Sequence, residues 1–100
     1  NTIVADDDSL GRIDFRGYNT SGNSYNQGAT IEARVDGTVN SSTDMPTSIL
    51  FKTSADGSAN PDERLRITPD GHILPGAAGT QDLGSTSKEF RNLYLGDVYL

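Results

Sequence analysis

Two segments of this chain alternate apolar and charged residues, and this pattern restricts both of them to β-strands. GRIDFRG (residues 11–17) places Ile13 and Phe15 on one side of a strand and its charged residues on the other. ATIEARVDG (29–37) repeats the alternation and closes on an Asp-Gly turn signal. Because side chains of a strand point to opposite faces in turn, each segment is expected to be half-buried.

The charges of these two strands favour one antiparallel register. It makes three pairs of opposite charge: Arg12 with Asp36, Asp14 with Arg34, and Arg16 with Glu32. In the same register Ile13 faces Val35 and Phe15 faces Ala33. Each exposed pair contributes about 0.2–1 kcal/mol, so the charges select a register more than they create stability. The alternative is a chance agreement between two alternating strands.

Two further segments, ILFKT (49–53) and RLRIT (64–68), alternate in the same way and predict strands. The turn sequence PDG (69–71) before HILP predicts a hairpin after the second of them. The polar stretches between the strands are rich in Gly, Asn and Ser and predict surface loops. These loops cover residues 18–28, 38–48 and 54–63.

The end of the chain has a different character. LPGAAGTQ (74–81) predicts a flexible connector, and Thr86 with Glu89 three residues later forms a capping box for one short helical turn. LYLGDVYL (93–100) then places apolar residues on both sides of a predicted strand. Such a strand must be covered on both faces. The expected contacts with neighbouring copies are Phe90, Leu93, Leu95, Val98 and Leu100.

Composition supports association. Leu, Ile, Val and Phe together number 21 of the 100 residues, and the apolar share of 33% is low for a self-contained core. Eight basic residues against fourteen acidic ones give no reason to expect nucleic-acid binding. Without cysteine the chain has no disulfide or thiolate chemistry. No apolar run is long enough for membrane insertion, so a soluble protein is expected, or a piece of a longer one.

The chain offers little for catalysis, metal binding or a cofactor. In the expected register Asp14, Glu32 and Asp36 each have an arginine partner. The single histidine, His72, follows a turn glycine, although three copies of it could meet on the axis of a trimer. ADDDS (5–9) lacks the spacing of a calcium loop and is interpreted as a solvated acidic entry. We therefore expect no catalytic residue, no resident metal and no cofactor.

Binding is a better candidate. Tyr18 and Tyr25 flank a polar stretch, and with Asn19 and Asn26 they are candidate contacts for a host glycan or surface protein. Aromatic rings stack on sugar faces while amides bond hydroxyl groups. The alternative is that these tyrosines close over the sheet of an adjacent subunit.

The order of several motifs resembles the distal part of bacteriophage tail fibres and tailspike-like proteins, above all those of marine and cyanobacterial phages. The motifs are GRIDFRGYN, ATIEARVDG, DMPTSILFKTSADGSANPDERLRITPDGHI and DLGSTSKEFRNLYLG, and they span about residues 10–96. The resemblance implies a homotrimer and a location upstream of a C-terminal intramolecular chaperone. Release of such a module, or a fragment boundary, would end the chain at Leu100 in mid-pattern.

The prediction is therefore an all-β, intertwined homotrimeric fibre segment with short strands, long loops and one helical turn. Residues 1–100 form one trimer-forming domain, with a strand-and-loop body (1–76) followed by a connector, helical turn and terminal strand (77–100). The resemblance implies a structural role in host-surface attachment, on the virion and outside the cell, with the rest of the fibre as partner. The alternatives are a fragment of a glycan-degrading tailspike enzyme and a trimeric bacterial adhesin stalk.

Overall fold

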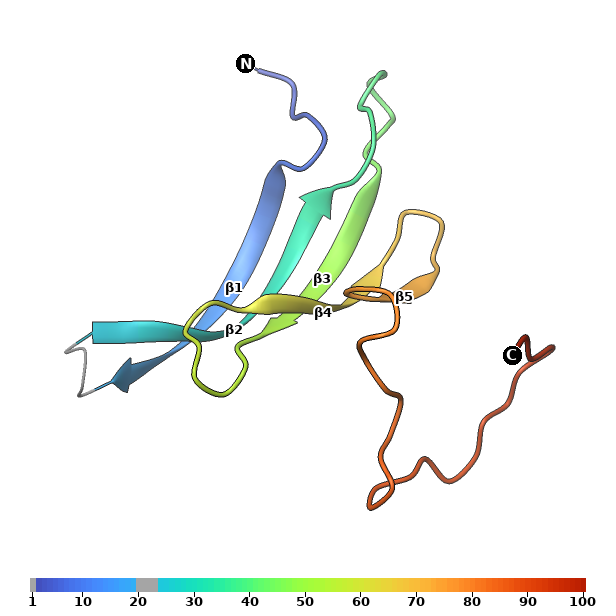
Figure 1. Ribbon diagram of the computed structural model, residues 1–100. Coiled ribbons are helices and arrows are strands. Elements are labelled where there is room, and N and C mark those ends of the chain that lie inside the picture. Colours follow the sequence, from blue (N-terminus) through green and yellow to red (C-terminus); the bar gives the residue numbers. More distant parts are fainter. Residues whose placement is uncertain (1, 20–23) are drawn as a thin grey trace.

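The computed structural model describes residues 2–19 and 24–100, and in them five strands form one antiparallel sheet in chain order (Figure 1). The predicted strands within residues 11–17, 29–37, 49–53 and 64–68 and the predicted hairpin are confirmed. The part of the chain that is described contains no helix long and apolar enough to cross a membrane. The strands are β1 (Ser9–Asn19), β2 (Ser24–Val35), β3 (Thr47–Thr53), β4 (Asp62–Ile67) and β5 (Ile73–Pro75).

The PDG sequence forms the expected turn between β4 and β5. The backbone N–H of Thr68 donates to the carbonyl of His72 (2.9 Å), and Gly71 donates to the carbonyl of Thr68 (2.9 Å). Gly71 has a φ of 85°, in the left-handed region that glycine adopts without steric cost. His72 therefore lies in a tight turn at the edge of the sheet.

The predicted register of β1 and β2 is wrong. Ile13 lies opposite Ile31, and Arg12 lies opposite Glu32. The predicted pairs of Arg12 with Asp36, Asp14 with Arg34, and Arg16 with Glu32 therefore do not face one another. The actual register is shifted by four residues, which leaves every side chain on its expected face because the period of a strand is two.

The shift arises because the strands extend into the segment predicted as a loop. β1 continues to Asn19 and β2 begins at Ser24, so most of the stretch 18–28 is strand; its residues 20–23 lie outside the described part. A bulge between Phe15 and Arg16 interrupts the pairing, and β3 pairs with β2 only from Ala29 onward. Residues 16–19 and 24–27 thus form a two-stranded hairpin arm that projects beyond the sheet.

The C-terminal region differs from both predictions made for it. Residues 82–100 contain neither the predicted helical turn nor the predicted terminal strand. Ser85 prevents the helix: its hydroxyl accepts the N–H of Lys88 (3.0 Å), and its own N–H donates to the Lys88 carbonyl (2.9 Å). In the predicted helix the Lys88 carbonyl would instead accept the N–H of a residue one turn later, so its bond with the Ser85 N–H replaces the helical ladder. Figure 1 shows this region (orange to red) leading away from the sheet.

Candidate assembly interface

Apolar residues at odd-numbered positions of β1 to β5 form continuous rows across one side of the sheet, here called the apolar face. The strand registers align one row across all five strands and a second row next to it. The first row is Ile13, Ile31, Phe51, Leu65 and Pro75, and the second is Ala33, Ile49, Ile67 and Ile73.

The opposite side, here called the charged face, is organised around Glu32. One carboxylate oxygen of Glu32, Oε1, contacts Arg34 Nη2 at 2.8 Å and Lys52 Nζ at 3.1 Å. Burial alone would raise the pKa of Glu32, but hydrogen bonds from Ser9, Lys52 and Arg34 outweigh it and lower that pKa below its usual value. Glu32 is therefore held in its ionised form between two cations.

A second ionic cluster extends the charged face toward β4. Arg66 binds both carboxylate oxygens of Glu63, through Nε (2.9 Å) and Nη2 (2.7 Å), and its Nη1 contacts Asp36 (3.3 Å). The hydrogen bond to Glu63 raises the pKa of Arg66, against the effect of burial. The Ser48 hydroxyl donates to the same Asp36 carboxylate. Leu50 lies between Glu32 and Arg66 in the register and is fully buried, since the stems of long charged side chains shield apolar surface.

Burial on the two faces is the reverse of what their polarity would give in a monomer. On the charged face Glu32 is 3% exposed and Thr30 is 2% exposed, while on the apolar face Ile31 is 37% and Ile13 is 59% exposed. Among the described residues, every buried side-chain polar atom has a hydrogen-bond partner. The charged face covers itself through its own ion pairs, whereas Ile13, Ile31, Leu65 and Ile73 on the apolar face remain exposed in the described part of the chain.

The size of the exposed surface supports the same conclusion. The chain exposes 8036 Å², whereas a monomeric protein of this mass exposes about 5,500 Å². Its radius of gyration is 17.1 Å, against about 13 Å for a compact domain of this length. Among the described residues, only Val35 and Leu50 are fully buried apolar side chains. About 2,500 Å² more surface is therefore open than a self-sufficient monomer would leave.

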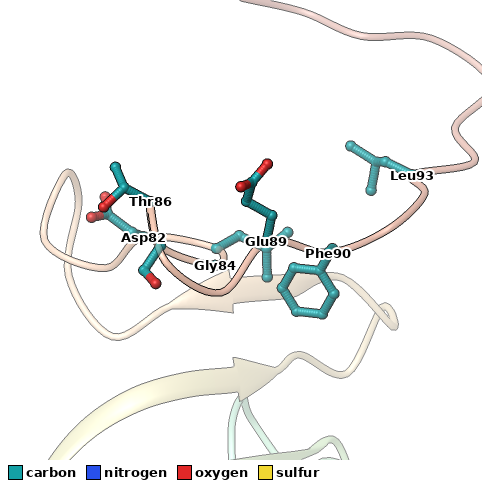
Figure 2. A pocket seen from close by; sticks show the side chains of 8 residues that line it. Asp82, Gly84, Thr86, Glu89, Phe90 and Leu93 are labelled. Carbon is teal, nitrogen blue, oxygen red and sulfur yellow. The ribbon is translucent and has the colours of Figure 1, made fainter.

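A local turn fixes the direction of the C-terminal region. Gly84 has a φ of 82°, and a side chain there would meet the Lys88 carbonyl at 3.3 Å and the Phe90 ring at 3.4 Å. Figure 2 shows Gly84, Phe90 and Leu93 around this turn. The residues predicted as contacts between copies are all exposed in the single chain: Phe90 (65%), Leu93 (65%), Leu95 (54%), Val98 (60%) and Leu100 (fully).

The fold of this chain occurs in solved structures. The carboxy-terminal domain of the bacteriophage T5 L-shaped tail fibre matches with a TM-score of 0.75 at 17% sequence identity, over 91% of this chain and 33% of that one. The same domain with its intra-molecular chaperone domain matches equally well, over 23% of its length. This chain has the fold of a phage tail fibre domain. It spans a third or less of each matched chain. No protein-family model and no curated protein matches the sequence.

The tail fibre fold confirms the predicted resemblance at the level of structure and places the predicted receptor contacts on the hairpin arm. Tyr18 and Tyr25 lie opposite each other, with ring centroids 5.3 Å apart and planes at 59°. Asn19 and Asn26 occupy neighbouring positions of the same arm. Ser54 ties the β3–β4 loop to this arm, because its N–H donates to Gly28 (2.9 Å) and its hydroxyl to Gln27 (3.0 Å). An open hollow lies between that loop and Tyr18, Asn19 and Asn26.

The acidic N-terminal segment (residues 5–9) has a structural role. Asp6 accepts the N–H of Gly37 (2.8 Å), and Asp8 accepts the N–H of Ala5 (2.8 Å). Asp7 donates its backbone N–H to Val35 at the end of β2. No group of three or more metal-ligating side chains occurs within residues 2–19 and 24–100.

The sequence does not predict the apolar face as a candidate interface. Its alternation predicts one buried side for the strands that carry Ile13, Ile31 and Leu65, and no segment is predicted to cover that side. The signal was present, because the sequence contains no second layer of amphipathic elements to pack on the sheet.

Proposed function

We propose that this chain is a structural segment of a phage tail fibre that assembles with two further copies of itself. The observation that carries the proposal is the apolar face, on which Ile13, Ile31, Leu65 and Ile73 are exposed while Glu32 on the opposite side is buried. Apolar surface of this extent is buried in stable proteins, and association buries it without a larger core. The number three rests on the sequence resemblance to tail fibres.

The fold and the resemblance together support a location on the virion, outside the cell, and a connection to the rest of the fibre. In this proposal residues 1–100 act as one assembly domain. Residues 1–76 supply the sheet, and residues 77–100 supply the extended C-terminal region. The role is to extend the fibre and to present its surface to a host.

Sedimentation velocity on variants of the two faces tests the assembly. Ile13→Asp places a charge on the apolar face and should convert the assembled species to single chains. Arg12→Ser removes a charge from the neighbouring position on the charged face and should leave the sedimentation coefficient unchanged. If Ile13→Asp sediments like the parent chain, the apolar face is not the assembly surface.

We further propose that the hairpin arm contacts the host surface, with a glycan as the ligand. Tyr18 is 54% and Tyr25 is 66% exposed, and they form a tilted aromatic pair beside the hollow lined by Asn19 and Asn26. Binding to a panel of bacterial surface polysaccharides should fall at least tenfold in Tyr25→Ala and remain in Tyr94→Ala. If both variants bind like the parent chain, the arm is not the contact.

The rival enzymatic function would require two unpaired carboxylates about 5–9.5 Å apart in a groove. Three carboxylates of the sheet are instead paired with cations: Asp14 with Arg12, Glu32 with Lys52, and Glu63 with Arg66. This pairing favours the structural role over the tailspike enzyme. The adhesin stalk, as the second rival, relies on the same assembly and differs in its cell-envelope anchor.

A further inference from the structure

We propose that residues 93–100 of one copy, here called the C-terminal ribbon, lie on the apolar face of a neighbouring copy. This inference rests on the proposed assembly and specifies which surfaces meet. The two largest unpartnered apolar features of the described chain are this face and this ribbon. Each has the chemistry that the other requires, since both are aliphatic and both are exposed.

The bend at Gly96 allows the ribbon to become one-sided in the proposed contact. In a regular strand Leu93 and Leu95 would point to one side and Val98 and Leu100 to the other. The chain bends at Gly96, and nothing lies within 4 Å of a side chain placed there. We propose that, in the contact, Gly96 acts as the extra residue of a β-bulge, which reverses the alternation. The four aliphatic residues would then share one side and the two tyrosines of the ribbon the other.

The dimensions of the ribbon and the apolar face agree. Eight residues of extended chain span about 26 Å, at about 3.3 Å per residue. The row from Ile13 to Pro75 crosses five strands, which is about 19 Å at about 4.8 Å between neighbours. The ribbon is therefore long enough to cover a full row.

The single chain keeps its ribbon away from its own sheet. The turn at Ser85–Lys88 and the packing of Phe90 on Gly84 direct the chain outward, as Figure 1 shows. In the proposed assembly each copy donates its ribbon to one neighbour and receives the ribbon of the other neighbour. Such a head-to-tail contact closes into a ring of three when each copy is rotated by a third of a turn, and every apolar face then receives one ribbon. A stable interface takes about 800 Å² from each partner, well within the excess surface of this chain.

Engineered cysteines test the pairing directly, because the natural chain has none. One variant carries Leu95→Cys in the ribbon and the other carries Ile31→Cys in the apolar face. The two are unfolded together, refolded as a mixture and treated with a short bismaleimide. The mixture should give at least fivefold more linked dimer than either variant alone. In the matched control, Leu95→Cys is mixed with Arg12→Cys, which lies on the charged face, in place of Ile31→Cys. This mixture should give no more linked dimer than either variant alone.

The outcomes separate this inference from the proposed function. Light scattering that shows three copies, with no excess of mixed dimer, would overturn the ribbon pairing and leave the assembly intact. A chain that carries both Leu95→Cys and Ile31→Cys and links only within itself would show that each ribbon covers its own sheet. Single chains in light scattering would overturn both proposals.

Discussion

Ile31 and Glu32 are neighbours in β2 and point to opposite faces of the sheet, yet the isoleucine is 37% exposed and the glutamate 3% exposed. Glu32 is covered because Arg34 and Lys52 fold over the charged face to reach its carboxylate. Ile31 is open because the described chain has no second layer above the apolar face. In the proposed assembly, the stability of the sheet therefore depends on ion pairs on one side and on other copies on the other.

Removal of Lys52 should destabilise the protein strongly. Lys52→Met leaves the buried Glu32 carboxylate with Arg34 as its remaining ion-pair partner. Loss of one member of a buried pair costs about 3 kcal/mol, since the other charge stays desolvated. Urea denaturation should show this loss in the free energy of unfolding. The double variant Glu32→Gln/Lys52→Met removes the buried charge as well and should recover more than half of it; no recovery would refute the pairing.

Stability should fall at acidic pH. Hydrogen bonding from Arg12 lowers the pKa of Asp14, and the contacts from Ser9, Lys52 and Arg34 lower that of Glu32 despite its burial. A carboxylate whose folded pKa lies below its unfolded pKa adds stability above the unfolded value, about 4, and loses it as the pH falls through the folded value. The melting temperature should be constant from about pH 7 to 5 and fall below about pH 4.

Glu32→Gln provides the matched test of this pH dependence. Its melting temperature should start lower at neutral pH and decline less on acidification, because one of the two shifted carboxylates is absent. A parent chain whose melting temperature rises between pH 5 and 3 would contradict the proposed role of these ion pairs.

Gly76 should not tolerate any side chain. Its N–H donates to the Arg64 carbonyl (2.9 Å), and a Cβ atom there would overlap the carbonyl of Glu63. Gly76→Ala should therefore lower the free energy of unfolding by about 1–3 kcal/mol through overpacking. Gly11→Ala is the control, since nothing lies within 4 Å of a side chain at that site. Equal stability of the two variants in urea would show that β5 docks on β4 differently.

The sequence predicted the strands well because alternation decides both the strand and its face. It did not predict the register, because a shift of four residues keeps Ile13 opposite an apolar residue and Arg12 opposite an acidic one. The length of the turn decides between such registers. The Gly-, Asn- and Ser-rich stretch predicted a loop, although the strands continue through the Tyr18–Tyr25 pair. The capping box failed because the Lys88 carbonyl accepts the N–H of Ser85 instead of the N–H of a residue one turn later.

The sequence predicted only the C-terminal part of the candidate interface. The shortage of apolar residues indicated that each copy needs others, and the five expected contacts from Phe90 to Leu100 are exposed. The exposure of the apolar face could not be predicted, because alternation shows which side of a strand is apolar but not whether anything covers that side. Whether that side is covered depends on the packing of the whole sheet, over which the described chain places no second layer, rather than on one segment.

The most direct test of shared burial is the mass of the chain in solution, measured by light scattering over a hundredfold dilution and followed by a thermal melt. The proposed assembly requires three times the chain mass of 10.7 kDa at every concentration at which the sheet remains folded. A monodisperse species of 10.7 kDa with a cooperative melt would contradict it.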